Sequence, residues 1–404
     1  MPIIFFLRAV MKKFFLLSIL FLLLFFSVDA LAITADGWAS QNGGTTGGAG
    51  GTVVTVTNAA DLEYYAELGT TPYIIQISGT ITIGTGLLEI SANKTLIGIG
   101  QNPTLVGNVG FRNRDGNIII ENLNITNPYA GSSYDGISLK QEIHNVLVTK
   151  CNIYDCGDGG FDITNESDLV TVSWCKFYFS TSPPDPAHQF MCLVGSSDKQ
   201  TGDIGKLRVT YHHNWWANNV KERMPRVRYG QVHVYNNYYS NLKTGGYCVG
   251  VGCGSYIRVE NNYFNTVPNP WKNYYTGETD CHSAGHIGWN TGNIFYNCTQ
   301  PTWASNEYST IFTPPYEYTL DDAADLQAMV TAYAGAGTPY PPHWLETVYG
   351  DFDKNGTVDI YDLDTFADYW LGTVCDELAD ADYDDDCKVN FYEFMLMAEN
   401  WMLQ

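Results

Sequence analysis

The chain has 404 residues, with 21 Lys and Arg against 43 Asp and Glu, which gives a formal net charge of −22 at pH 7. Hydrophobic residues make up 45% of the chain, enough for a sizeable core and too many for a globally disordered protein. The acidic balance argues against nucleic acid as a partner, because phosphate binding needs clustered Lys and Arg. Charged residues are only 16% of the total, a composition that favours an extracellular β-rich protein.

The first 32 residues predict an export signal. Three basic residues precede an apolar run at 14–26, and alanines follow at positions 30 and 32. A basic start, a short apolar segment and a small-residue cleavage site are typical of secretory signals. We therefore expect residues 1–32 to be removed and the protein to be secreted. No later segment is long and apolar enough to predict a membrane span.

Export makes the ten cysteines candidates for disulfide bonds. Cys375 and Cys387 lie close together near the C-terminus and form the first predicted pair. Cys248 and Cys253, five residues apart, are a second possible pair. No paired C-x-x-C spacing indicates a zinc site.

Seven stretches in the middle of the chain resemble one another. Each alternates apolar and polar residues, turns at Asn or Cys and ends in apolar or aromatic residues. Their turn residues are separated by 29, 24, 39, 23, 25 and 31 positions, and a β-rich unit at this period is one coil of a solenoid. The turn residues are Asn122, Cys151, Cys175, Asn214, Asn237, Asn262 and Asn293.

The repeats predict an all-β fold, a right-handed parallel β-helix. Stacked coils place equivalent residues about 4.8 Å apart, so the turn asparagines would form an internal ladder of amide hydrogen bonds. Cys151 and Cys175 would lie in this ladder, either bonded or packed. The spacing of 39 after Cys175 predicts an insertion, and insertions in a solenoid form loops on one face, often the binding face. A β-sandwich is the weaker alternative, because its strands share no residue template.

Three carboxylates fall on adjacent predicted coils. Asp135 lies on one coil, and Asp158 and Asp162 flank a Gly-Gly turn on the next. Hard cations such as Ca²⁺ prefer oxygen ligands, so the three side chains form a candidate calcium site. A solvated turn explains the DGGFD motif equally well.

Three arginines, Arg223, Arg226 and Arg228, lie within six residues of a chain that is poor in basic residues. A guanidinium group matches a carboxylate bidentately, so the segment predicts a site for an anionic sugar acid. Surface ion pairs are the alternative. The adjacent His212 and His213 lie on a repeat strand, which favours packing beside the ladder over metal binding.

Residues 33–335 resemble the pectate lyases of the parallel β-helix pectate and pectin lyase superfamily. The most specific motifs are VTYHHNWW at 209–216, RxPxxR at 223–228 and VHVYNNYYSN at 232–241. Further matches lie at 35–48 and 93–98. The resemblance implies cleavage of α-1,4-polygalacturonate by β-elimination, in which a base removes the C5 proton and an unsaturated end remains.

The resemblance also implies roles for individual residues. Arg223 corresponds to the base and Arg228 to a substrate-carboxylate contact, and we add Arg226 and His188 as substrate contacts. The calcium ligands correspond to Asp135, Asp158 and Asp162. An arginine base is demanding because its free pKa exceeds about 12. Ca²⁺ and crowded positive charge should assist its deprotonation, and activity should rise at alkaline pH.

The chain departs from the family pattern at two places. The family's Trp-Ile-Asp-His signature is replaced by residues 147–150, and Phe190 lies where a substrate-binding Lys is usual. The lost contact favours partly methylated pectin or lower activity, so a pectin lyase and a weakly catalytic pectate-binding protein are the alternatives. The retained carboxylates favour a calcium-dependent pectate lyase. A glycoside hydrolase would need two catalytic carboxylates, which are better used here on a cation.

The segment 346–404 holds 16 acids and 2 Lys, so it carries about two thirds of the excess negative charge. Two stretches, 351–362 and 382–393, fit an EF-hand-type loop, and apolar helices are expected after them at 363–371 and 394–403. The duplicated loop resembles a type I dockerin, with Cys387 in place of the second loop's Gly. The predicted calcium ligands are Asp351, Asp353, Asn355, Thr357, Asp359, Asp362, Asp382, Asp384, Asp386, Lys388, Asn390 and Glu393.

These features predict four segments and their partners. The segments are a signal peptide at 1–32, a lyase domain at 33–337, a linker at 338–345 and a dockerin-like domain at 346–404. We expect a secreted monomer that binds polygalacturonate and Ca²⁺. The resemblance to dockerins implies a cohesin-type partner on a scaffold or cell surface.

Overall fold

The computed structural model of the chain describes residues 34–340 and a few residues of the C-terminal segment. Within 34–340 it omits 113, 130, 132–133, 276–279, 291, 300 and 302–310, and beyond 340 it describes 352, 358, 360–370 and 389. The chain divides into two compact units, Ile33–Thr338 and a unit made of Met1–Ala32 with Pro339–Gln404. No helix in the described residues is long and apolar enough to cross a bilayer.

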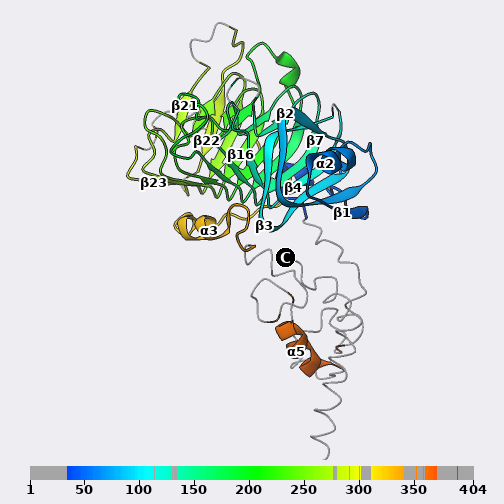
Figure 1. The fold of residues 1–404 in the computed structure, drawn as a ribbon. Coiled ribbons are helices and arrows are strands. Elements are labelled where there is room, and N and C mark those ends of the chain that lie inside the picture. Colours follow the sequence, from blue (N-terminus) through cyan, green and yellow to red (C-terminus); the bar gives the residue numbers. More distant parts are fainter. Residues whose placement is uncertain are drawn as a thin grey trace, which may run out of the picture. The chain divides into compact units, whose positions relative to one another are not determined.

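The larger unit is a parallel β-helix in which each coil contributes a strand to up to three faces (Figure 1). The first face contains β1 (Thr52–Val56), β2 (Tyr73–Ile90), β3 (Lys94–Phe111), β4 (Gly116–Glu121), β7 (His144–Thr149), β10 (Asp168–Ser173), β13 (Val209–His212), β16 (Gln231–Tyr235), β19 (Tyr256–Glu260) and β22 (His286–Trp289). The second face contains β5 (Asn124–Thr126), β8 (Asn152–Tyr154), β11 (Lys176–Tyr178), β14 (Trp215–Trp216), β17 (Tyr238–Tyr239), β20 (Tyr263–Asn265) and β23 (Ile294–Tyr296). The third face contains β6 (Ile137–Leu139), β9 (Phe161–Ile163), β12 (Leu193–Val194), β15 (Arg226–Val227), β18 (Val249–Val251) and β21 (Trp271–Asn273).

The strands pair in parallel along each face, and from β4 onward each pair keeps one register. Val148 of β7, for example, lies between Ile120 of β4 and Val172 of β10. These three side chains are fully buried and point into one continuous core. The prediction of a parallel β-helix is confirmed.

The described residues include three α-helices. Helix α2 (Ala59–Ala66) covers the first coils with buried Leu62 and Ala66, and its N-terminus is capped by the Asn58 side chain. Helix α3 (Leu326–Tyr333) buries Leu326 and Val330 against the second face. The smaller unit contains α5 (Ile360–Tyr369), which begins three residues before the helix expected at 363–371. Two short 3-10 helices, Gly37–Ser40 and Thr201–Asp203, complete the described helices.

The predicted ladder of turn asparagines is confirmed from Asn214 onward. The amide oxygen of Asn237 accepts from the backbone and side-chain nitrogens of Asn214, each at 3.0 Å. In the same way, the amide oxygen of Asn262 accepts from both nitrogens of Asn237, and that of Asn293 accepts from both nitrogens of Asn262. The ladder therefore satisfies polar groups that are fully buried inside the turn.

Asn122 does not belong to this ladder, so that prediction is wrong by one residue. The register pairs Ile120 with Val148, which places Leu123 and not Asn122 on the level of Cys151. Asn122 has a left-handed backbone with φ of 52° and shares this conformation with Lys150 one coil later. Asn tolerates this conformation better than most residues do, which explains the Asn before the ladder position.

The cysteines pair differently from one of the predictions. Cys253 bonds to Cys281, whereas Cys248 is a buried thiol of the core, so the possible Cys248–Cys253 bond is wrong. Cys151 and Cys175 are also free and buried, so they pack in the column without bonding. Cys375 and Cys387 lie outside the described residues.

The chain ends of the larger unit cover the first face. The Trp38 backbone N–H donates to Thr210 Oγ1 and the Ala39 N–H donates to Thr171 Oγ1, both at 3.0 Å. From the other end of the domain, the Tyr316 hydroxyl lies 2.7 Å from Thr210 Oγ1 and 2.9 Å from His233 Nδ1. The outward polar side chains of β10, β13 and β16 therefore hold both covering segments.

His212 and His213 pack beside the ladder, as expected. The His213 ring stacks on Trp174 at 4.2 Å, and its Nε2 lies 2.6 Å from Asp321 Oδ2. The His212 Nε2 atom lies 2.9 Å from Asp36 Oδ2. These contacts join the same covering segments to the solenoid.

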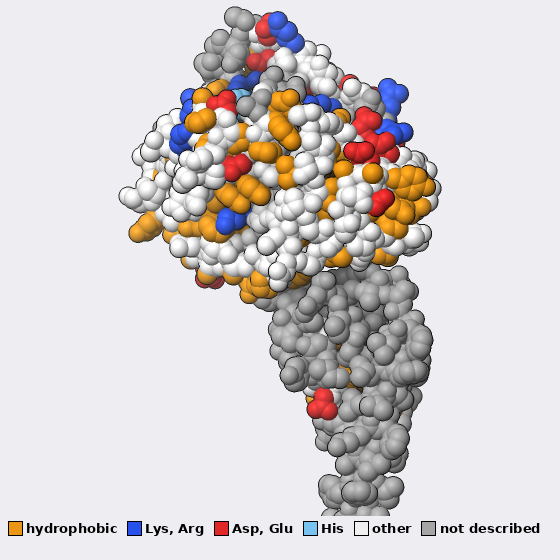
Figure 2. Space-filling view, in the orientation of Figure 1, with side chains coloured by type: hydrophobic (Ala, Val, Ile, Leu, Met, Phe, Trp, Pro, Cys, Tyr) orange, Lys and Arg blue, Asp and Glu red, His pale blue; other side chains and the backbone are white. Residues whose placement is uncertain are grey.

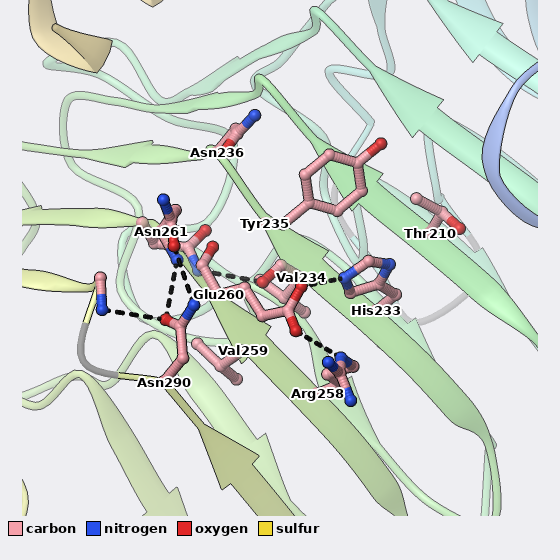
Figure 3. Close-up of polar contacts among 12 residues, drawn as sticks. Thr210, His233, Val234, Tyr235, Asn236, Arg258, Val259, Glu260, Asn261 and Asn290 are labelled. Carbon is pink, nitrogen blue, oxygen red and sulfur yellow. Dashed lines mark hydrogen bonds and ion pairs between the residues drawn. The ribbon is translucent and has the colours of Figure 1, made fainter. Parts of the chain in front are cut away.

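Three ionisable side chains, His233, Glu260 and Arg258, contact one another across β16 and β19 (Figure 3). His233 Nε2 lies 3.1 Å from Glu260 Oε2, and Arg258 Nε bonds to the other oxygen of Glu260. His233 and Glu260 are fully buried. Burial lowers the pKa of His233 to about 4, although the neighbouring Glu260 acts in the opposite direction.

The His233 pKa predicts a loss of stability in acid. The unfolded chain protonates this side chain near pH 6.5, whereas the folded chain does so near pH 4, so the unfolded state binds more protons between these values. The free energy of unfolding should therefore fall as the pH falls, by up to about 3 kcal/mol at pH 4. Denaturant unfolding at several pH values should show this slope in the wild type and a weaker slope in His233→Gln. Equal slopes in the two proteins would contradict the assignment.

Candidate active site

The third face of the solenoid carries a row of outward residues, one from each coil. Their Cα atoms follow one another in the parallel register, in which the pair Ile163–Val194 sets Leu193 beside Asp162, so each lies about 4.8 Å from the next. The turns just before these strands add further polar side chains. The row contains Ser138, Asp162, Leu193, Arg226, Gly250 and Lys272, and the preceding turns contribute Asp135, Asp158, Phe190 and Arg223.

The three predicted carboxylates come together around Gly159. The Gly159 N–H donates to Asp135 Oδ1 at 2.9 Å. A Cβ atom at Gly159 would lie 2.5 Å from Asp162 Oδ1 and 3.0 Å from Asp135 Oδ1. Only glycine leaves room for both carboxylate oxygens at this point, so the turn brings two acidic groups of adjacent coils to one small space.

Burial and mutual repulsion act on these carboxylates. Burial raises the pKa of Asp135, against hydrogen bonds from Ser138 and Gly159, and the charge of Asp158 adds to the rise. Burial also raises the pKa of Asp162 well above its usual range, the charge of Asp135 adds to this effect, and the Arg223 charge opposes it. The protein therefore places negative charge where it is poorly solvated, which a cation would relieve.

Each carboxylate also has a partner within the protein. Asp135 Oδ2 accepts from Ser138 Oγ at 2.6 Å, and Lys140 Nζ lies 3.6 Å from the same oxygen. Asp162 Oδ1 accepts from the Leu193 N–H at 3.1 Å. Within the described residues no group of three or more His, Cys, Asp or Glu side chains is arranged as a ready metal cage.

His188, predicted as a substrate contact, lies against the acidic cluster. Its Nε2 atom is 3.0 Å from Asp158 Oδ1, and its ring packs 4.1 Å from the Phe190 ring. His188 and Phe190 come from the loop between β11 and β12, which is part of the predicted insertion after Cys175. The insertion thus lies on the face that carries the site, as the repeat spacing predicted.

Arg223 and Arg226 are held by aromatic rings on this face. The Arg223 guanidinium carbon lies 4.6 Å from the Phe190 ring centre, and that of Arg226 lies 4.2 Å from the Tyr274 ring centre. Their Nε atoms are buried without a hydrogen-bond partner among the described residues. Burial lowers the pKa of Arg226, and the nearby positive charges of Arg228 and Arg223 lower it further.

Arg228 has a different environment from the other two arginines. Its Nε donates to Asp198 Oδ1 at 2.8 Å and its Nη1 donates to the Gly195 carbonyl at 3.0 Å. Only 11% of its side chain is exposed. The structure therefore fixes this guanidinium through Nε and Nη1, and Nη2 has no hydrogen-bond partner among the described residues.

Several residues near the site were not predicted from the sequence. Tyr274 contacts Arg226, Asp198 pairs with Arg228, and Lys140 pairs with Asp135. Lys221 lies with its Nζ 5.8 Å from the Phe190 ring centre. None belongs to a recognisable motif, and each meets its partner only through the folding of the coils and loops, so no sequence signal singles it out.

Charged side chains gather at the upper edge of the β-helix in Figure 2, whereas the flank below is mostly uncharged. The third-face strand β21 reaches this upper region in Figure 1. A row of acids and arginines along one solenoid face suits an extended, charged ligand that lies across the coils.

Comparison with known proteins identifies the family to which this arrangement belongs. A family profile described as "Pectate lyase" matches residues 12–339. A pectate trisaccharide-lyase of Bacillus licheniformis is 32% identical over 333 residues, which cover 78% of this chain and 90% of that protein. A protein of the same name from Thermotoga maritima is 32% identical over 331 residues, covering 73% and 84%.

Solved structures give the same result. A crystal structure of a pectate lyase from Bacillus sp. N165 in complex with trigalacturonate has a TM-score of 0.63 and 29% identity, and covers 75% of this chain and 99% of that one. The parallel β-helix and the row of acidic and basic side chains on its third face are therefore those of a polysaccharide lyase. The chain belongs to the pectate lyase family.

Proposed function

We propose that the protein is a secreted, calcium-dependent pectate lyase that cleaves α-1,4-polygalacturonate by β-elimination. The observation that carries this proposal is the convergence of three carboxylates and three arginines on one face of the solenoid, within the four coils from β6 to β15. Family membership and the trigalacturonate complex of a related structure support the substrate class.

Asp135, Asp158 and Asp162 are the residues that would hold Ca²⁺. The space at Gly159, which a Cβ atom would fill, and the raised pKa values of Asp135 and Asp162 fit a hard cation with oxygen ligands. Bound there, Ca²⁺ would supply positive charge beside the carboxylate of the substrate, on which negative charge builds during proton removal.

Arg223 is the proposed base. It removes the C5 proton, the C5–H electron pair forms the C4–C5 double bond, and the C4–oxygen bond breaks with its electrons on the leaving oxygen, which then takes a proton from water. The Phe190 ring fixes the guanidinium, and the Arg223 Nε has no hydrogen bond to break among the described residues. Arg226 binds a substrate carboxylate, and so does Arg228 through Nη2, which has no partner among the described residues.

Replacing Arg223 tests the base. Arg223→Ala and Arg223→Lys should lower kcat on polygalacturonate about 100-fold or more, with less change in KM. The assay follows the absorbance of unsaturated uronate ends with and without EDTA, and Arg114→Lys on an exposed part of the surface is the control.

Wild-type activity should rise toward alkaline pH, because an arginine acts as a base only when unprotonated. Reducing ends without absorbance would indicate a hydrolase instead.

Replacing Gly159 tests the calcium site. The Cβ atom of Gly159→Ala would collide with Asp162 Oδ1 and crowd Asp135 Oδ1, so Ca²⁺ affinity at this site should fall about 10-fold or more. Calorimetric titration with Ca²⁺ measures the change. Gly86→Ala, where a Cβ meets nothing within 4 Å, is the matched control. Unchanged calcium binding in Gly159→Ala would exclude the three carboxylates as the site.

We also propose that the first 32 residues export the protein and that the C-terminal segment is a dockerin that attaches it to a cohesin-type partner. Most of the predicted loop ligands lie outside the described residues. Asp362, the twelfth position of the first loop, is buried and accepts the Phe352 N–H at 2.7 Å, which joins the two ends of that loop. This contact supports a loop closed as in EF-hands.

Calcium stoichiometry tests the dockerin. The full chain with Asp362→Ala and Glu393→Ala should bind two fewer Ca²⁺ ions than the wild type and keep its lyase activity, because neither residue is among those proposed to act on the substrate. Equilibrium dialysis measures the number of bound ions. An unchanged number would contradict the two loops, and failure of the full chain to bind any surface protein of its own cell with Ca²⁺ present would remove the cohesin partner.

Action on methylated pectin is the second candidate function, and Phe190 is the observation that favours it. An apolar ring at the position where the family usually has Lys removes one charge partner for a sugar carboxylate. Comparing kcat/KM on polygalacturonate and on highly methylated pectin separates the two, since the proposed enzyme should prefer the unmethylated polymer.

A further inference from the structure

A cavity of about 510 Å³ opens on the third face beside the acidic cluster. It lies over the coils of β2, β3 and β6, on the opposite side of Asp162 from the arginines. Its volume is in the range of small-ligand pockets. Residues that line it include Glu89, Asn108, Tyr134, Ser138, Lys140 and Gln141.

The lining of the cavity has the chemistry of a sugar site. Tyr134 supplies an aromatic ring, which packs 5.8 Å from the Tyr129 ring in a tilted arrangement. Asn108 and Gln141 supply amide groups that can both donate and accept hydrogen bonds. A ring face together with amides can bind both the apolar and the hydroxyl-bearing sides of a pyranose.

The charges at the cavity favour one orientation of an acidic sugar. Lys140 is half-exposed, and its Nζ lies 3.6 Å from Asp135 Oδ2 at the border between the cavity and the acidic cluster. Glu89 also lines the cavity and would repel an anionic group placed near it. A sugar carboxylate is therefore expected on the Lys140 side.

The cavity is too far from Arg223 to hold a sugar at the reacting bond. Strand β6 is separated from β15, which follows Arg223, by three coil steps through β9 and β12. At the spacing of parallel strands this is about 14 Å. A sugar in the cavity therefore belongs to a part of the polysaccharide beyond the two sugar residues whose bond is cleaved.

We propose that this cavity is a distal subsite that binds one uronate residue of the polymer, with Lys140 as the partner of its carboxylate and Tyr134 as the support for its ring. The proposal rests on the proposed function, because it assigns a further part of the same substrate. It makes the enzyme favour chains that reach from Arg223 to the cavity over chains that do not.

The test compares long and short substrates. The ratio of kcat/KM for polygalacturonate to kcat/KM for trigalacturonate should fall about two- to fivefold in Lys140→Gln, the size expected for a half-exposed ion pair. Thr85→Trp, a substitution at an exposed residue that lines the cavity, should lower the same ratio by blocking it. Arg114→Gln, another exposed cation of the same region that pairs with Glu142, should leave the ratio unchanged.

The outcomes distinguish the subsite from other effects. A loss of equal size on both substrates would mean that Lys140 acts through Asp135, and would overturn the proposal, as would an unchanged ratio. Calorimetric binding of hexagalacturonate and trigalacturonate to the wild type and Lys140→Gln gives a second reading that needs no turnover. If the wild type forms no unsaturated product, the proposed function fails, yet a length-dependent loss of binding in Lys140→Gln would still support the subsite.

Discussion

The parallel register of the coils is the constraint on which the rest of this structure depends. Each residue lies one strand spacing from its partner on the next coil, so a position in one repeat fixes the position of its counterpart in all others. Asp162, Leu193 and Arg226 are 31 and 33 residues apart in sequence and are neighbours on the third face. Loops of different length between the strands change nothing in this row, which lets the insertion after Cys175 add His188 and Phe190 without moving the arginines.

The same register brings like charges of adjacent coils close together, where they repel one another. Buried carboxylates of adjacent coils meet at Gly159, and the arginines of the row lie within reach of one another's charge. In the proposed function, a cation would relieve the repulsion among the carboxylates, and a polyanionic substrate would relieve the repulsion among the arginines. It also explains how an acidic protein can attract an acidic polymer. The attraction depends on local positive charge on the third face and not on the net charge of −22.

Much of the fold could be predicted because the repeats are regular. Alternating strands and the buried asparagines identify the coil, and a ladder of amides follows from stacking. The error at Asn122 has a physical origin, because Asn suits both the ladder position and the left-handed position just before it. The amino-acid sequence of this repeat therefore does not determine its register. Helices α2 and α3 were missed because each is only eight residues long and is stabilised by packing on the solenoid.

The site was predictable only where a motif carries it. The motif RxPxxR identifies three arginines but not their different environments, which depend on side chains far away in sequence. Asp198 reaches Arg228 from an insertion, and Tyr274 reaches Arg226 from a later coil. The bond between Cys253 and Cys281 shows the same limit, because their distance is set by the coil geometry and not by their separation of 28 residues.

In the proposed function, Ca²⁺ held by carboxylates of adjacent coils and the arginines of the same row would bind the substrate together. Linkage provides the most direct measurement: Ca²⁺ titration of the inactive Arg223→Ala protein, with and without saturating hexagalacturonate. If the cation and the sugar share the site, the oligosaccharide must raise Ca²⁺ affinity, and Ca²⁺ must raise oligosaccharide affinity by the same factor. Calcium and oligosaccharide affinities that are independent of each other would contradict the account.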